Sequence, residues 1–232
     1  YSKSQSDFLV KNLNLRECER PKVLLSGSIA GVNLDRFKYD LKKRIIARKE
    51  LNISNSKFVI LFVSRLNYSK GIYTLINSFK DYLLHFKDDI LLLVGPVEES
   101  EILKTLKATK NVKHIDYVED TSKYYQLSDL FILPSLREGF GSVLIEAASV
   151  SLPSIVSEIP GAIDAVEVSK TALTFKVKSE ASLLKAMIYL RKNKKLRKKM
   201  GKFARKRVEN KFCENDISNA FFNFINGLIK DD

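Results

Sequence analysis

The sequence has few of the residues that bind metals or form disulfides. Among its 232 residues there are two cysteines, Cys18 and Cys213, and two histidines, His85 and His114. Two cysteines so far apart make no disulfide framework, which favours a reducing compartment. So few soft ligands cannot assemble a zinc site, and no serine, histidine and aspartate set suggests a hydrolytic triad. The composition therefore argues against a zinc enzyme and against a disulfide-stapled secreted domain.

The sequence also lacks long apolar runs and several familiar motifs. Its longest apolar stretch, ILLLVG at 90–95, is far shorter than the roughly 18 residues of a membrane span. A G-x-G-x-x-G fingerprint is absent, because Leu144 follows Gly139 and Gly141 where the third glycine would stand. There is no G-x-x-x-x-G-K-[ST] and no Asp-x-Asp. These absences argue against a P-loop nucleotide triphosphatase and a carboxylate-bound metal–diphosphate site.

Positive charge is plentiful but confined to one segment. The formal net charge is +13, and residues 185–211 hold thirteen lysines or arginines and one acid, Glu209. That segment accounts for +12 of the total, and the rest of the chain for +1. A solvated helical face is the simplest interpretation, followed by an anionic membrane surface. Nucleic acid is disfavoured as a partner, because no aromatic interleaving or recognised binding motif accompanies the charge.

From residue 58 onward, continuously apolar segments alternate with helical patterns. The predicted strands are residues 58–64, 90–95, 112–115, 130–134, 154–157 and 172–175. The predicted helices are residues 71–86, 98–108, 121–128 (capped by Thr121) and 142–150, then helices from 179 with breaks near Asn193 and Phe212. Strands and helices in this order indicate a parallel sheet covered on both faces. The predicted fold class is a doubly wound α/β sheet followed by C-terminal helices.

The chain is predicted to contain three parts. Residues 1–57 carry one strand within 22–37 and a basic helix at 41–51, which is too little for a domain. We interpret this part as the end of a preceding domain and a linker. Residues 58–192 form the α/β domain, and 193–232 form basic C-terminal helices. Because the chain begins at Tyr1 and not at Met, we expect a piece of a longer protein.

The loops after the predicted strands carry the candidate site, because ligands bind outside the carboxyl ends of parallel strands. Arg65 and Lys70 follow the first strand, and Gly71 precedes a helix. A guanidinium, an ammonium and a helix N-terminus together suit a diphosphate. Each feature alone has an ordinary explanation as a solvated surface loop. A binding site is favoured because these features lie together at one edge of the predicted sheet.

A second candidate loop, LREGFGSVLIE at 136–146, follows the fourth strand. Gly139 and Gly141 allow backbone N–H groups to approach a ligand without an intervening Cβ. The helix that begins near Ser142 offers its N-terminus to phosphate. Glu138 can accept hydrogen bonds from sugar hydroxyls, and Glu146 from a vicinal diol such as a ribose. The loop is therefore predicted to bind sugar and ribose hydroxyls through its two acids, Glu138 and Glu146. The glycine turn between them is predicted to admit the phosphates.

These stretches resemble the C-terminal, donor-binding half of retaining glycosyltransferases of the GT-B fold and glycosyltransferase 4 type. The similar segments are GSIAGVNLDRF, FVSRLNYSKGIYTLINSF, the region from LSDLFILPSLREGFGSVLIEAASV to IPGAIDAV, and MGKFARKRVENKF. The spacing of the two acids around the turn, E-x7-E, is the most specific match. Ser64 stands where the family usually has glycine, and Ala162 and Ile163 replace residues that are often polar.

The resemblance implies a role for each matched residue. Arg65 and Lys70 would bind the donor diphosphate, and Glu138 would contact the donor sugar. The sugar and phosphates would lie against Gly139, Phe140, Gly141 and Ser142, and Glu146 would hold the ribose. Val118 and Glu119 would flank the base.

The resemblance also implies the reaction. Family members transfer a sugar from a nucleotide-diphosphate sugar with retention and without a metal or other cofactor. A UDP-sugar donor, a polysaccharide or lipid-linked oligosaccharide acceptor, and a location in the cytoplasm or at the inner face of its membrane are expected. The family's acceptor-binding N-terminal domain is missing from this sequence, so weak or no turnover is expected without an N-terminal-half polypeptide. Two alternatives remain: a non-catalytic nucleotide-sugar-binding subunit and, less favoured, a nucleic-acid-binding protein.

Overall fold

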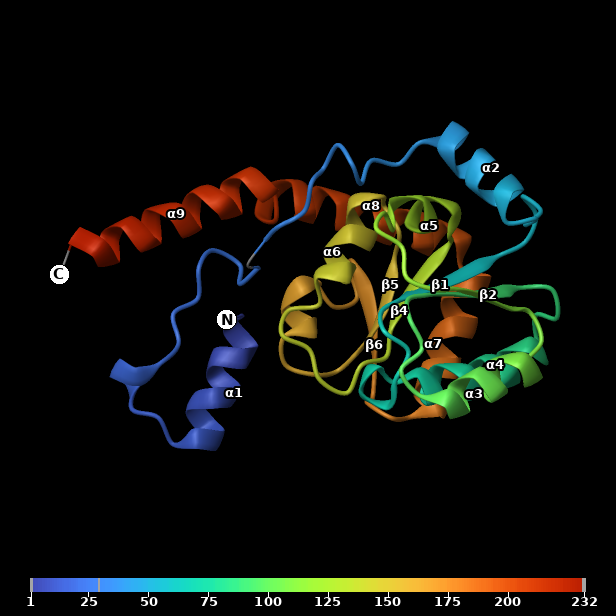
Figure 1. The fold of residues 1–232 in the computed structure, drawn as a ribbon, viewed down its shortest axis with the longest axis horizontal. Coiled ribbons are helices and arrows are strands. Elements are labelled where there is room, and N and C mark those ends of the chain that lie inside the picture. The colour runs from blue at the N-terminus through green and yellow to red at the C-terminus, as the bar shows by residue number, and fades with distance from the viewer. Residues whose placement is uncertain (1, 29, 231–232) are drawn as a thin grey trace.

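The protein, described here from a computed structural model over residues 2–28 and 30–230, is built around one six-stranded parallel sheet (Figure 1). The strand order is β3-β2-β1-β4-β5-β6, the doubly wound order. The strands are β1 (Val59–Val63), β2 (Ile90–Val94), β3 (Val112–Ile115), β4 (Leu130–Leu133), β5 (Ser154–Ser157) and β6 (Ala172–Phe175). The fold class and the positions of all six predicted strands are confirmed.

Side-chain alternation along the strands builds a separate apolar core on each face of the sheet. In β1, Val59 and Leu61 face one core while Ile60 and Phe62 face the other. The first face is covered by residues of α5 (Ser122–Leu127), α6 (Ser142–Ser149) and α8 (Lys194–Lys211). The second is covered by α3 (Ile72–Leu83), α4 (Ser100–Ala108) and α7 (Glu180–Lys192). Burial on both faces explains why these strands are continuously apolar.

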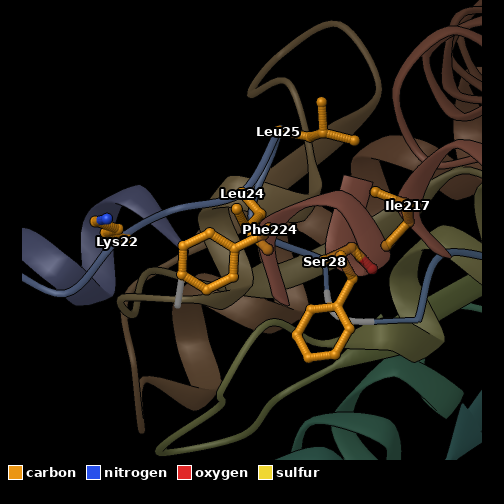
Figure 2. A pocket seen from close by; sticks show the side chains of 8 residues that line it. Lys22, Leu24, Leu25, Ser28, Ile217 and Phe224 are labelled. Carbon is orange, nitrogen blue, oxygen red and sulfur yellow. The ribbon is translucent and has the colours of Figure 1, made fainter. Parts of the chain in front are cut away.

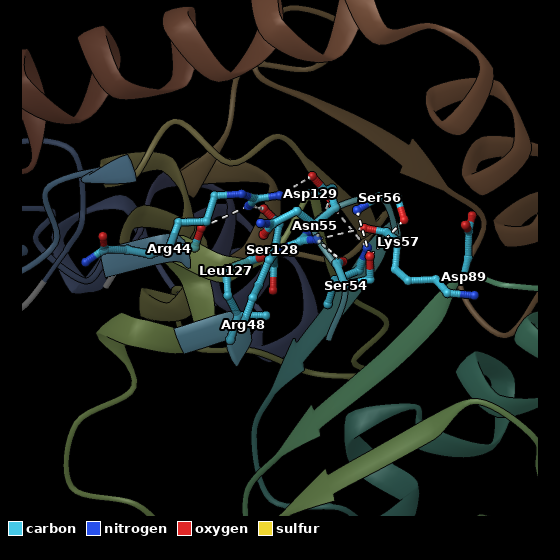
Figure 3. A network of polar contacts seen from close by, with 12 residues as sticks. Arg44, Arg48, Ser54, Asn55, Ser56, Lys57, Asp89, Leu127, Ser128 and Asp129 are labelled. Atoms are coloured by element: carbon cyan, nitrogen blue, oxygen red, sulfur yellow. Dashed lines mark hydrogen bonds and ion pairs between the residues drawn. The ribbon is translucent and has the colours of Figure 1, made fainter. Parts of the chain in front are cut away.

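The helix α2 (Leu41–Glu50) is held at the amino edge of the sheet by hydrogen bonds from two of its arginines, Arg44 and the buried Arg48 (Figure 3). Arg48 donates from Nη2 to Asp129 Oδ2 at 2.8 Å and from Nε to the Leu127 carbonyl at 2.9 Å. Arg44 donates to the other oxygen, Asp129 Oδ1, at 2.7 Å. Asp129 Oδ2 also accepts from the Val59 backbone N–H at 2.9 Å, so one carboxylate ties α2 to the starts of β1 and β4.

Two local predictions are wrong. The described residues 22–28 form coil and a turn, because none of the described strands pairs with them. The side chain of Thr121 does not cap α5; Asp120 does this instead, accepting from the Ser122 backbone N–H at 2.9 Å. The predicted breaks near Asn193 and Phe212 are confirmed, since they separate α7, α8 and α9 (Glu214–Lys230).

The two ends of the chain lie on the same side of the sheet domain (Figure 1). The helix α1 (Lys3–Leu13) lies beside it, and α9 projects away from it. An apolar hollow of about 420 Å³ lies between residues 22–28 and α9, and Leu24, Ile217 and Phe224 contribute to its lining (Figure 2). Among the described residues, no helix combines the length and apolarity that crossing a bilayer requires.

Candidate functional site

The loop after β1 is held against the end of β4 by a glycine contact. Gly71 has φ of +73°, and a Cβ at this position would lie 2.0 Å from the Pro134 carbonyl oxygen. Only glycine tolerates both the conformation and the approach. The Leu136 backbone N–H also donates to the Ser69 carbonyl at 2.8 Å. These contacts place Lys70 beside the loop that follows β4.

Lys70 and Glu138 meet in an ion pair at this edge of the sheet. Lys70 Nζ lies 2.8 Å from Glu138 Oε1, and the two side chains are 19% and 11% exposed. Ser135 Oγ donates to the same carboxylate oxygen at 2.6 Å. Neither Ser135 nor its contact was predicted from the sequence, although its position directly after Pro134 at a strand end is a usable signal. Both side chains of the pair are therefore largely buried but keep some exposed surface.

Arg65 shares this loop but has a different partner. Its Nη1 donates to Glu98 Oε1 at 2.7 Å, and its side chain is 60% exposed. Glu98 lies in the loop after β2, and its other oxygen accepts from Asn67 Nδ2. Hydrogen bonds from Asn67 and Arg65 lower the pKa of Glu98, and the nearby charge of Lys70 lowers it further. Arg65 and Lys70 therefore influence one carboxylate, but the structure does not bring Arg65 onto Glu138.

The second acid of the predicted motif lies one turn inside α6, apart from the lysine pair. Glu146 Oε2 accepts from the buried Tyr125 hydroxyl at 2.7 Å. Burial raises the pKa of Glu146, while the Tyr125 hydrogen bond and the charge of Arg36 oppose this rise. Glu146 is thus a half-buried acceptor whose hydrogen-bond donor among the described residues is Tyr125. The site has two acidic ends, and the turn at 139–141 lies between them in the chain.

The residues at 139–142, in the turn and at the start of α6, differ in how exposed they are to solvent. Gly139 is exposed, and a Cβ added there would have Gln5 Nε2, at 4.0 Å, as its nearest neighbour. Phe140 is buried, with its ring 5.4 Å from that of Phe212, so only its backbone can serve a ligand. Ser142 is exposed at the first position of α6. This agrees with a loop that offers backbone to a ligand.

The predicted base-flanking residues lie in the loop after β3. Val118 packs against the first core, and Glu119 is exposed. The Glu119 carbonyl accepts from Arg36 Nη2 at 3.1 Å, and Arg36 also pairs with Asp120 Oδ1 at 3.1 Å. Arg36 links this loop to the region of Glu146, because its charge acts on the Glu146 carboxyl. The sequence did not single out Arg36.

The helix α1 is bound directly to the backbone of the Glu138 loop. Gln5 Nε2 donates to the Glu138 carbonyl at 3.1 Å. Ser4 Oγ accepts from the Gly161 N–H at 2.8 Å and donates to Asp164 Oδ2 at 2.6 Å. Gly161, with φ of +85°, is packed so closely that an added Cβ would lie 2.4 Å from the Glu138 carbonyl oxygen. These contacts make α1 a support for the loop, a role that no local sequence pattern signals.

Comparison with known proteins shows which family the chain belongs to. The family model described as glycosyl transferases group 1 matches residues 43–207. The capsular polysaccharide biosynthesis glycosyltransferase CapM of Staphylococcus aureus is 33% identical over 224 residues, covering 94% of this chain and 58% of CapM. A Campylobacter jejuni N,N'-diacetylbacillosaminyl-diphospho-undecaprenol alpha-1,3-N-acetylgalactosaminyltransferase is 26% identical, covering 99% of this chain and 60% of that protein. The chain thus spans less than two thirds of these relatives.

Solved structures show the same fold at low identity. HepE of Anabaena, crystallised with UDP, has a TM-score of 0.86 and 19% identity, covering 97% of this chain and 62% of that one. The C-terminal domain of a group 1 glycosyltransferase from Francisella tularensis, LpcC, has a TM-score of 0.69 and 18% identity, covering 79% of this chain and 99% of that domain. The expected GT-B C-terminal fold is confirmed. The chain belongs to the group 1 glycosyltransferase family.

Proposed function

We propose that this chain binds the donor, a UDP-sugar, for a retaining hexosyltransferase that needs no metal or other cofactor. Its acceptor would be a polysaccharide or a lipid-linked oligosaccharide on the cytoplasmic side of the membrane. The observation that carries the proposal is the Lys70–Glu138 pair, 2.8 Å apart beside the exposed Gly139 at the carboxyl edge of the sheet. The relatives' names support it, since CapM serves capsular polysaccharide biosynthesis and HepE was also crystallised with UDP-glucose.

Each group has a role that follows from its chemistry. In the transfer, the bond between the anomeric carbon and the diphosphate oxygen breaks, an acceptor hydroxyl oxygen bonds to that carbon, and the hydroxyl proton passes to the leaving diphosphate. Lys70 and Arg65 stabilise the negative charge that grows on the leaving diphosphate. Glu138 accepts from donor sugar hydroxyls, and the start of α6 adds backbone N–H groups for the phosphates. These cationic and N–H groups together give the leaving group electrostatic stabilisation.

The nucleoside would extend from the diphosphate toward Glu146. Its carboxylate can accept from both ribose hydroxyls, as an enclosed acceptor paired only with Tyr125 among the described residues. The backbone of Val118 and Glu119 would flank the base. Because the chain covers 58–60% of its curated relatives, we propose that turnover needs an N-terminal-half polypeptide that binds the acceptor.

Calorimetry of the purified chain tests the proposal without requiring turnover. We expect UDP-glucose or UDP-N-acetylglucosamine to bind more tightly than the GDP and ADP sugars. Gly139→Ala should weaken binding several-fold at unchanged thermal stability, because its Cβ enters open space on the ligand side. Lys104→Ala on α4, an exposed lysine distant in the fold, is the matched control. Absence of binding by every nucleotide sugar, or equal binding by Gly139→Ala, would contradict the assignment.

A further inference from the structure

A second functional surface lies at the amino edge of the sheet, opposite the donor site. Two hollows of about 920 and 450 Å³ share Tyr39, Val150, Ser151 and Lys198 in their linings, so they form one groove. Asp129 and Pro153, which immediately precede β4 and β5, line its floor. The groove runs between α8 and the segment leading into α2. We call this groove, together with the outer side of α2, the α2–α8 face.

The α8 side of this face carries a stripe of uncommitted lysines. Lys194, Lys198, Lys202 and Lys206 recur every fourth residue, so they lie along one side of the helix. All four are exposed, and no described residue accepts a hydrogen bond from their ammonium groups.

The arginines beside this stripe are already committed. Arg205 donates to the Phe37 and Ser149 carbonyls at 3.1 and 2.6 Å and pairs with Glu209 at 2.7 Å. Asp129 is likewise occupied by Arg44 and Arg48. The two acids that line the groove, Asp129 and Glu209, are therefore already paired with arginines. The charges of the four lysines have no acidic partner among the described residues.

The α2 side of the face adds exposed apolar side chains. Leu41, Ile45 and Ile46 are 60%, 45% and 57% exposed, and Tyr39 is also exposed. Lys42 and Lys49 are exposed on the same helix. Single exposed apolar residues are ordinary, but four of them within eight positions, interleaved with lysines, form a patch. A helix side with both characters is typical of a surface that lies at a bilayer interface.

We propose that the α2–α8 face docks this protein on an anionic phospholipid surface. The lysine stripe supplies attraction to lipid phosphates, and Leu41, Ile45 and Ile46 enter the headgroup boundary. Nucleic acid would use the lysines but leave the apolar residues without a function. Docking through the amino edge leaves the carboxyl edge, with Lys70 and Glu138, open to solvent. Membrane binding and nucleotide binding are therefore separate properties, and either can fail without the other.

Vesicle flotation of the purified chain tests the charge component. We expect strong association with vesicles of equal parts phosphatidylglycerol and phosphatidylcholine, and little with phosphatidylcholine alone. The triple variant K198E/K202E/K206E should bind about a hundredfold more weakly, since each surface cation contributes about one decade or slightly less. The matched control K104E/K107E/K110E reverses three exposed lysines on and just after α4 and should retain binding. Added salt should release the protein by screening.

A second variant tests the apolar component and distinguishes the alternatives. L41S/I45S/I46S should weaken vesicle binding about tenfold or more while leaving heparin and oligonucleotide binding unchanged. Its control is L84S/L103S, two exposed leucines elsewhere. UDP affinity and thermal melting should be equal in all variants. Full vesicle binding by either triple variant overturns the proposal. So does equal binding to neutral vesicles, or a dimer in sedimentation that L41S/I45S/I46S abolishes.

Discussion

The two edges of the sheet each hold a cluster of bases and acids, but the clusters differ in how fully their hydrogen-bonding groups are used. At the amino edge, Arg48 is 1% exposed, and its guanidinium donates to one carboxylate and four backbone carbonyls. At the carboxyl edge, Lys70 uses one of its three donors, on Glu138, among the described residues. A cluster whose hydrogen-bond donors are all used, such as that of Arg48, can only stabilise the fold. A cluster with unused donors, such as that of Lys70, can also bind a ligand.

The largest expected effect concerns the cluster of Arg48. Arg48→Met should lower the free energy of unfolding by about 3–5 kcal/mol, because it leaves buried carbonyls and part of the Asp129 carboxylate without a partner. Urea denaturation measures the change. Arg16→Ala, which removes the exposed Arg16–Glu19 pair, should cost at most about 1 kcal/mol. Equal losses in the two variants would show that Arg48 is not a structural anchor.

The next largest effect is expected from the removal of Lys70, whose ammonium group has unused donors. Lys70→Ala should weaken UDP-sugar binding by about 1.5–3 kcal/mol, the range for a hydrogen bond to a charged group. Calorimetry beside Lys104→Ala as control measures this loss. Its effect on unfolding should be smaller than that of Arg48→Met. If Lys70→Ala lowered the free energy of unfolding but left UDP-sugar affinity unchanged, Lys70 would be a structural residue like Arg48. The two edges would then not differ in role.

Glu146 should give a pH dependence with opposite signs for binding and for stability. Burial raises its pKa, so the folded state holds a proton that the unfolded state releases. Its contribution to stability is therefore largest at acid pH and declines as pH rises from the unfolded pKa through the raised folded pKa. Ribose hydroxyls donate to the ionised form, so UDP affinity should rise over the same interval.

Glu146→Gln should remove both pH dependences and weaken UDP binding by about 1–3 kcal/mol. Calorimetry and thermal melting across the acid range measure the two trends. Tyr125→Phe is a companion variant that removes the hydroxyl donor to Glu146. A pH profile that Glu146→Gln leaves intact would assign the titration to another group.

The smallest expected effect comes from the support beneath the Glu138 loop. Ser4→Ala removes the side-chain hydrogen bonds to Gly161 and Asp164 but keeps the bond from the Ser4 backbone N–H to Asp164, and should reduce UDP-sugar affinity by about 0.5–1.5 kcal/mol. UDP affinity should remain constant, because the support acts on the loop that is proposed to contact the sugar. A calorimetric comparison of UDP with UDP-glucose separates the two. Equal losses for both ligands would make Ser4 a general structural residue.

Periodicity was sufficient to predict the sheet, its order of elements and the helix breaks near Asn193 and Phe212. It was also sufficient to place Lys70 and Glu138 at one edge, since strand ends of a parallel sheet converge. It failed at residues 22–28, where a strand-like pattern pairs with none of the described strands. It also selected Thr121 as the cap of α5, although Asp120 competes more effectively for the same N–H group.

The partners of the site residues could not be predicted in the same way. Glu98 holds Arg65, and Gln5 holds the Glu138 carbonyl, through loop and helix contacts between residues far apart in the sequence. Such contacts depend on side-chain positions in the folded state, and neither spacing nor composition records them. The exposed leucine and isoleucines of α2 were likewise invisible, because an apolar helix residue is normally assumed to be buried.

The Lys70–Glu138 contact has a consequence for ligand exchange. In the ion pair, the ammonium and the carboxylate neutralise each other's charge. In the proposed function, an incoming diphosphate would compete with Glu138 for the ammonium. When the diphosphate leaves, Glu138 would pair with Lys70 again. In the proposed function, this exchange would speed product escape and return the resting site to neutrality after each cycle.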